Sequence, residues 1–197
     1  MERVSSLFHI KRMFFNKALR ILLATNAMIL IAGAMLGPIY ALFIEKVGGD
    51  LLDASFAGAT FALVAGITVL LSGKYSDRLE QKKLIVVLGY AIMGIGFLLY
   101  TQVSSIWFLL LVQVLIGFGE AIYNPPFDAL YSEHLDGRKT ATEWGAWEAM
   151  NYFSIAIGAV IGGFIVTKFG FNTLFVSMAI LCFSSAVYIY HLPKRIL

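Results

Sequence analysis

Six long apolar runs constrain this chain more than any other feature of its sequence. Each run holds about 18 residues or more, and about 20 residues at a rise of 1.5 Å cross a hydrocarbon core about 30 Å thick. Each run therefore predicts a helix that spans a membrane. The predicted spans are residues 18–44, 54–72, 84–101, 105–123, 141–167 and 173–192.

The runs are continuously apolar, whereas the strands of a membrane β-barrel alternate apolar and polar residues over about ten positions. Hydrophobic residues make up 59% of the chain, above the ~45–50% apolar share of soluble domains. The sequence thus predicts an all-α, polytopic membrane protein with almost no soluble domain. Its predicted parts are a cytoplasmic N-terminal segment at 1–17, a six-helix transmembrane domain at 18–192 and a cytoplasmic tail at 193–197.

Lysine and arginine fall almost entirely on one side of the predicted membrane. If the N-terminus is cytoplasmic, the outer connections hold only Lys46 and Lys168 of the fifteen basic residues. The other thirteen lie inside, and this asymmetry predicts orientation because basic loops stay in the cytoplasm. We therefore expect a multi-pass protein of the cell membrane with both termini in the cytoplasm. The net charge of +3 then reflects topology and indicates no nucleic-acid partner.

The sequence favours no enzyme class. An intramembrane serine protease needs a histidine within a span, and a phosphatidyltransferase needs closely spaced aspartates for its metal ion. The three histidines, which lie in connections or at a helix end, are His9, His134 and His191. The aspartates are scattered, and neither a P-loop nor a Cys/His cluster occurs. We expect no enzyme activity, no metal site and no cofactor.

The connection between the second and third predicted spans gathers charge, since six of the twelve residues at 72–83 are charged. Its motif residues are Gly73, Asp77, Arg78, Lys82 and Lys83. The pattern resembles the signature loop of the major facilitator superfamily, Gly-x-x-x-Asp-Arg/Lys-x-Gly-Arg/Lys-Arg/Lys. Glu80 takes the place of the second glycine, and the basic pair comes one residue late. The resemblance implies a cytoplasmic gate, in which Asp77 meets the positive end of a helix. A solvated loop that only marks topology is the alternative.

The fifth predicted span carries small residues at a second recognisable spacing. They are Gly145, Ser154, Gly158, Gly162 and Gly163. The spacing is similar to Gly-x8-Gly-x3-Gly-Pro-x2-Gly-Gly, the pattern of the fifth helix in antiporters of the superfamily, with Ser154 for one glycine and Ala159 for the proline. Ordinary close packing of helices through small residues is the alternative.

The fourth predicted span adds a third resemblance through Gln113, Gly117 and Gly119, followed by Pro125 and Pro126. The family often has an arginine, linked to proton coupling, where Gln113 stands. Together the three patterns cover about residues 18–192 and identify the chain as a member of the superfamily. They imply a half-bundle of six helices built as a 3+3 inverted repeat, and transport of a small solute by alternating access.

Polar residues form stripes along the first, fourth and fifth predicted spans. Because polar side chains are costly in lipid, such stripes are expected to face other helices or water. These three spans therefore look interior, and the third and sixth look peripheral. The expected cavity and proton-coupling residues are Asn26, Tyr40, Gln113, Glu120, Glu148 and Asn151.

Glu120 and Glu148 are expected near the cytoplasmic end of their spans, where no lysine or arginine accompanies them. A carboxyl group in a low dielectric without a cation resists ionisation, so it can exchange protons. Such a cavity disfavours anionic substrates. We therefore expect proton-coupled efflux of a neutral or cationic compound. Two structural alternatives remain for these carboxyls, which are hydrogen bonding between helices and contact with cytoplasmic water.

Transporters of the superfamily have twelve or more spans in two halves, and this sequence holds six. We expect a parallel homodimer, which would meet through the second and fifth spans at Gly145, Gly158 and Gly162, or a complex with a complementary half. A fragment of a longer protein fits equally well. The alternative function is a six-helix substrate-capturing or accessory subunit of a larger membrane transport complex.

Overall fold

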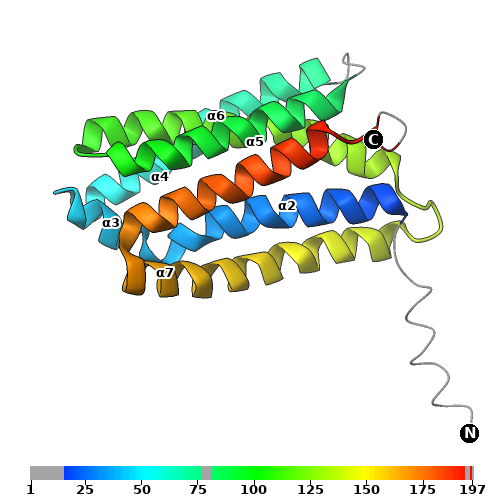
Figure 1. Ribbon diagram of the computed structural model, residues 1–197. Helices are drawn as coiled ribbons and strands as arrows, with labels where there is room; N and C mark the ends of the chain where they lie inside the picture. Colours follow the sequence, from blue (N-terminus) through cyan, green and yellow to red (C-terminus); the bar gives the residue numbers. More distant parts are fainter. Residues whose placement is uncertain (1–15, 77–80, 194–195, 197) are drawn as a thin grey trace, which may run out of the picture.

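The computed structural model describes residues 16–76, 81–193 and 196, and within these ranges the chain is helical with no strand (Figure 1). The all-α prediction is confirmed. The elements are α2 (Lys17–Leu36), η2 (Gly37–Ile39), α3 (Tyr40–Lys46), α4 (Leu51–Ser76), α5 (Lys82–Leu99), η3 (Tyr100–Gln102), α6 (Ile106–Glu133) and α7 (Thr140–Tyr190).

The first predicted span is not one regular helix. It starts at a cap, where the side chain of Asn16 accepts a hydrogen bond from the backbone of Leu19 at 2.9 Å. α2 then ends at Leu36, and the 3-10 turn η2, which contains Pro38, leads into α3. Proline lacks a backbone N–H, so the α-helical hydrogen bonding of the first predicted span is interrupted at Pro38.

α7 is 51 residues long and changes direction at Gly170, whose φ of 80° and ψ of 173° are not helical. A straight helix of that length would measure about 76 Å, more than twice the hydrocarbon thickness. In Figure 1 the yellow part of α7 and its orange-to-red part run in opposite directions. We call residues 140–169 the first arm and residues 171–190 the second arm. In the described part of the chain, five helices are long and apolar enough to cross a membrane, with α7 counted as one of them.

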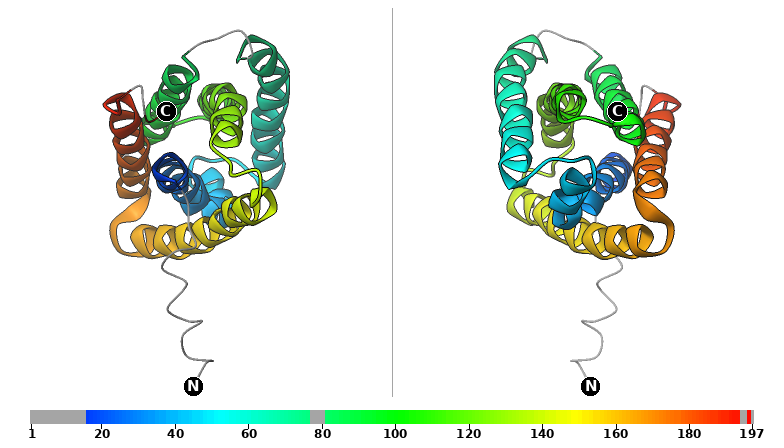
Figure 2. Two further views of the ribbon diagram at one scale, coloured as in Figure 1. Left: turned by 90° about the vertical axis from the view of Figure 1, so that its right-hand side faces the viewer. Right: turned by 90° about the vertical axis from the view of Figure 1, so that its left-hand side faces the viewer.

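The helices form a bundle in which α6 packs between α4 and α5, and α2 packs along α7. The second arm of α7 also lies against α5, since Gly94 faces the ring of Phe183. Seen end-on, α4, α5 and the two arms of α7 surround α2 and α6 (Figure 2). α2 and α6 touch each other at only a few positions, so the space between them is where a site can form.

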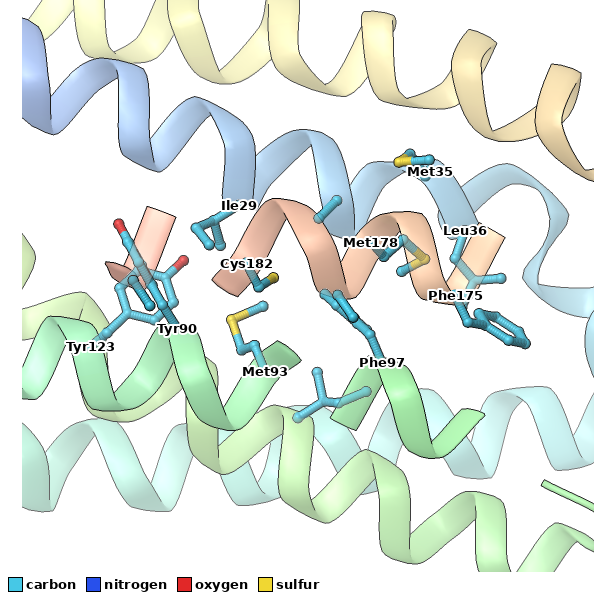
Figure 3. Close-up of a cluster of buried hydrophobic side chains, with 14 of the residues drawn as sticks. Ile29, Met35, Leu36, Tyr90, Met93, Phe97, Tyr123, Phe175, Met178 and Cys182 are labelled. Atoms are coloured by element: carbon cyan, nitrogen blue, oxygen red, sulfur yellow. The ribbon is translucent and has the colours of Figure 1, made fainter. Parts of the chain in front are cut away.

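The core lies between α2, α5 and the second arm of α7 (Figure 3). Tyr90 and Met93 of α5 are buried there, together with Phe175 and Met178 of the second arm. α5 and the second arm of α7, the third and sixth predicted spans, thus lie in the outer ring of the bundle (Figure 2) and bury one face in the core. α4 and the first arm of α7 are more exposed.

Three contacts gather four helix ends at one end of the bundle. Lys82 at the start of α5 forms an ion pair with Glu133 at the end of α6, at 2.5 Å. Lys83 donates a hydrogen bond to the carbonyl of Leu192, just beyond α7, at 2.6 Å. Asn16 donates to the carbonyl of His134 at 2.7 Å, which joins the start of α2 to the same place. We call this the Lys82 end.

The opposite end holds Lys46, whose ammonium group lies 5.4 Å from the centre of the Phe171 ring. Phe43 and Phe175 pack edge-to-face there, with ring centres 4.8 Å apart. We call this the Lys46 end. Lys46 thus lies at the end of the bundle opposite to Lys82 and Lys83, as the sequence predicts for these described residues.

Candidate functional site

Two adjoining hollows of about 270 and 400 Å³ lie between α2 and α6. Both are lined by Gly33 and Gly37 of α2 and η2, by Met93 of α5 and by Glu120 of α6. A Cβ atom added to either glycine would meet no atom within 4 Å, so both glycines border open space. The larger volume lies within the range of small-molecule sites, roughly 300–1,000 Å³, and the smaller volume lies just below it.

A hydrogen bond between two predicted residues lies in the wall of the larger hollow. The side-chain amide of Gln113 on α6 donates to the hydroxyl of Tyr40, the first residue of α3. Gln113 is buried, with 6% of its surface exposed. Because α2 ends before Tyr40, the η2 turn places this hydroxyl where α6 can reach it. The pair therefore joins the two sides of the hollow.

Glu120 is the one charged side chain among the described residues that line either hollow. It lies near the middle of α6, which runs from Ile106 to Glu133. The sequence placed it near a helix end because the predicted span stopped at residue 123. α6 instead continues through Pro125 and Pro126, since a proline breaks only local hydrogen bonds and membrane helices tolerate it.

The remaining cavity residues divide into one that lines a hollow and two that do not. Asn151 of the first arm of α7 lines the smaller hollow. Asn26 is buried and accepts a hydrogen bond from the hydroxyl of Tyr90 at 3.3 Å, so it joins α2 to α5. Glu148 is exposed and lies outside the lining of both hollows. The structure thus does not bring Glu148 together with Glu120.

The small residues of the first arm of α7 also divide. Gly158 and Gly162 face α2, and a Cβ atom at Gly158 would come within 2.7 Å of the carbonyl oxygen of Ile31. Gly145 and Gly163 face open space. The expectation that Gly158 and Gly162 contact a second copy is therefore wrong, because α2 of the same chain already occupies that surface.

Ser154 is the fifth member of this group of small residues. It is buried, and its hydroxyl lies 3.6 Å from the sulfur atom of Met150 in the preceding turn of the same helix. Ser154 stands four positions before Gly158, so it lies on the same helix face as Gly158 and Gly162, where the family pattern has a glycine.

The predicted gating residues are described only in part. Asp77 and Arg78 lie outside the described residues. Gly73 lies in the last turns of α4 and borders open space. Lys82 and Lys83 contact the ends of α6 and α7, as described above. The basic pair of the motif thus contacts two other helix ends of the same chain.

Several apolar residues of the hollows were not predicted from the sequence. Phe61 of α4, Phe97 of α5 and Met178 of α7 line the larger hollow, and Tyr123 lines the smaller one. They stand inside continuous apolar runs, where a residue that lines a hollow cannot be told from one that faces lipid. The one sequence feature that could have indicated such a lining residue was an aromatic residue close to a polar stripe, such as Tyr123 near Glu120.

A bundle of apolar helices around a hollow that carries one carboxyl group and a few amide and hydroxyl groups is typical of a membrane transport protein. The sequence profile of the Major Facilitator Superfamily matches residues 22–195. The chain belongs to this superfamily, whose members are membrane transporters of small molecules rather than enzymes.

Curated relatives differ in how much of their length this chain covers. It is 28% identical over 181 residues to "Multidrug resistance protein MdtG" of Proteus mirabilis (strain HI4320), which is 88% of this chain and 44% of the relative. It is 24% identical over 164 residues to an uncharacterized MFS-type transporter of Methanocaldococcus jannaschii, covering 82% and 41%. It is 22% identical over 156 residues to "Uncharacterized MFS-type transporter YitZ" of Bacillus subtilis (strain 168), covering 79% and 94%. The chain thus spans less than half of the first two relatives and almost all of the third.

Proposed function

We propose that the two arms of α7 cross the membrane separately, which gives six spans in a 3+3 inverted repeat with the Lys82 end in the cytoplasm. Each arm is long enough to cross a hydrocarbon core of about 30 Å. The reversal at Gly170 returns the chain to the end from which α7 started (Figure 1). The separation of basic residues between the two ends supports the orientation, with both termini in the cytoplasm.

The activity we propose is secondary active transport by alternating access, as proton-coupled efflux of a neutral or cationic compound. The observation that carries it is Glu120, the one charged group among the described residues that line the hollows. Without a cation beside it in a low dielectric, this carboxyl either takes up a proton or balances a positive substrate. The name of the MdtG relative, a multidrug resistance protein, supports export of such compounds.

Tyr40, Gln113 and Asn151 supply hydrogen-bonding groups to the same hollows and are the proposed substrate contacts. Asn26 does not line the hollows; its proposed role is to hold α2 against α5 through its hydrogen bond with Tyr90. We place coupling at Glu120 rather than at Glu148, because Glu148 is exposed and lies outside the described lining. The gate is assigned to the signature loop, with Asp77 and Arg78 acting beside Lys82 and Lys83.

Transport by this mechanism requires a second wall for the cavity. We propose that a second copy or a complementary half supplies it, packed against α4 and the first arm of α7. These two segments carry large exposed apolar side chains, among them Leu63 and Leu70 on α4 and Phe153 and Val160 on the first arm. The chain's coverage of 44% of MdtG supports pairing with a second unit of similar size. Of the glycines, Gly145 and Gly163 are open for this contact.

The deciding experiment measures proton flux and solute flux together in liposomes that contain the full chain. A panel of cationic, neutral and anionic solutes is tested with the wild type, Glu120→Gln and Glu148→Gln. We expect cationic or neutral solutes to move with protons in the wild type and in Glu148→Gln, and coupling to be lost in Glu120→Gln. Full solute flux without proton movement in all three proteins would show that Glu120 is structural and that the efflux proposal is wrong.

A further inference from the structure

A third hollow, of about 310 Å³, lies outside the transport site in the outer wall of the bundle. Its sides are the end of α4 and the start of α5, and its floor is α6. The lining residues are Thr68, Leu71, Ser72, Tyr75, Ser76, Ile85, Leu88, Phe118 and Ile122. Four of them, Leu71, Tyr75, Leu88 and Phe118, are exposed large side chains, so the hollow opens on the outer surface of the bundle.

The hollow presents an apolar surface to its occupant even though it contains two serines. Ser72 donates its hydroxyl proton to the carbonyl of Ile122 on α6 at 3.0 Å, and Ser76 donates to the carbonyl of Ser72 at 2.7 Å. Both hydroxyl groups are therefore used inside the protein. Because serine is small, the two residues let α4 approach α6 and leave space between α4 and α5.

The length and position of the hollow match a single lipid tail. From Thr68 to Tyr75 the wall extends over seven residues, or about 10 Å along the helix axis. One leaflet of the hydrocarbon core is about 15 Å thick. Since the hollow is bounded by the last turns of α4 and the first turns of α5, it lies in the leaflet at the Lys82 end.

Two lysines stand just beyond this apolar wall. Lys74 follows Leu71 by three positions, and Lys82 precedes Ile85 by three, so each lysine lies on the same helix face as a lining residue. Lys74 is exposed. Tyr75 is its neighbour in the sequence, and aromatic residues are enriched where helices meet lipid headgroups. Lys82 is ion-paired with Glu133 at 2.5 Å, so Lys74 is the cation that the rim offers to the phosphate of an anionic phospholipid.

We propose that this hollow binds one anionic phospholipid of the leaflet at the Lys82 end, with an acyl chain between α4 and α5 and the phosphate group near Lys74. The bound lipid fills the space that the two serines leave and joins α4 to α5 beside the signature loop. A lysine at an anionic membrane surface changes binding by about fivefold. Loss of Lys74 should therefore weaken retention of the anionic lipid by about that factor.

The first test compares lipid retention by mass measurement of the intact full chain in mild detergent. Phosphatidylglycerol and phosphatidylcholine with identical acyl chains are added in equal amounts. We expect preferential retention of one phosphatidylglycerol, a loss of about fivefold in Lys74→Gln and no loss in Lys168→Gln, which removes a cation from the other end. Equal retention of both lipids by the wild type would overturn the proposal, and so would unchanged retention in Lys74→Gln.

The second test locates the lipid. A phosphatidylglycerol with a photoreactive acyl chain should label peptides that contain residues 68–76 and 85–88 above other exposed helix faces. Leu88→Trp fills the hollow and should reduce this labelling, whereas Ile180→Trp, at an exposed position on the second arm of α7, should not. Even labelling of all exposed faces would overturn the proposal. If Leu88→Trp changes the oligomeric mass while lipid retention stays constant, the hollow is an interface between copies and the proposal fails. Labelling of the wild type decides the matter if Leu88→Trp does not fold.

Discussion

The side-chain amide of Gln113 donates a hydrogen bond to the hydroxyl of Tyr40, a residue 73 positions earlier in the chain. The two residues stand on α6 and α3, and both line the larger hollow. Because Gln113 is buried, its amide depends on this partner for a hydrogen bond. The bond therefore links the stability of the bundle to the shape of the proposed binding site.

Tyr40→Phe removes the acceptor and leaves the amide of Gln113 buried without it. We expect a cost of about 1–3 kcal/mol, which lowers the melting temperature by ~2–4 °C per kcal/mol for a protein of this size. Thermal unfolding in a mild detergent measures this effect. Tyr188→Phe, at a half-exposed tyrosine on α7, is the matched control. Equal melting temperatures for Tyr40→Phe and the wild type would show that the bond contributes no stability.

Gly162→Ala places a methyl group against the backbone of Met35 on α2. The two helices must then separate, and overpacking of this kind typically costs about 1–3 kcal/mol. Gly163→Ala is the control one residue further on, where a Cβ atom meets nothing within 4 Å. There we expect no loss, and a gain of up to about 1 kcal/mol from the better helix former. The prediction is wrong if the two variants melt at the same temperature.

Gly170→Ala introduces a Cβ atom where φ is 80° and ψ is 173°. Only glycine adopts this region readily, and the strain for another residue is about 1–3 kcal/mol. We expect a lower melting temperature and a loss of correctly folded protein in the membrane. Gly137→Ala, in the turn before α7, is the control, because this glycine has no positive φ and borders open space. An unchanged Gly170→Ala protein would mean that another turn geometry is available at the reversal.

Asp77→Asn tests the gate that the signature loop implies. A carboxylate at the positive end of a helix contributes about 0.3–1 kcal/mol, and more where it is partly buried. We expect the variant to insert normally and to lose most of its transport, since the closed cytoplasmic state is weakened. Glu45→Gln, which removes an exposed carboxylate at the Lys46 end, should transport normally. Full transport by Asp77→Asn would show that the loop has no gating role and only sets the orientation of the protein in the membrane.

The oligomeric mass in mild detergent tests the need for a second wall. We expect twice the mass of the chain, which is 21.7 kDa, or a stable complex with a second protein of similar size. Bulky substitution at Gly145, which is open in the single chain, should weaken that complex. A monomer that transports substrate at full rate would contradict the prediction. Co-purification of an energising partner would favour the accessory-subunit alternative.

The apolar segments, and the reversal between the fifth and sixth of them, were predictable from sequence. The reason is that the requirements of the hydrocarbon core apply to each stretch of about 20 residues separately. A window of sequence must be apolar to lie in the hydrocarbon core, and its backbone must bond within itself, so a helix follows whatever its neighbours are. Basic residues obey a similarly local rule. Lys46 and Lys82 were accordingly placed at opposite ends of the bundle without any knowledge of packing.

The sequence by itself therefore determined the apolar helical segments, their separation of charge and the membership of the superfamily. The tertiary structure alone decided which polar residues meet. Glu120 and Glu148 look alike in sequence, yet only Glu120 lines a hollow, and Gly158 packs on α2 while Gly163 stays open. The reason is that the rotation of each helix about its axis depends on contacts between distant segments. An apolar residue is compatible with the hydrocarbon core whether it faces lipid, the protein core or a hollow. Only the packing of the helices shows which of these it faces.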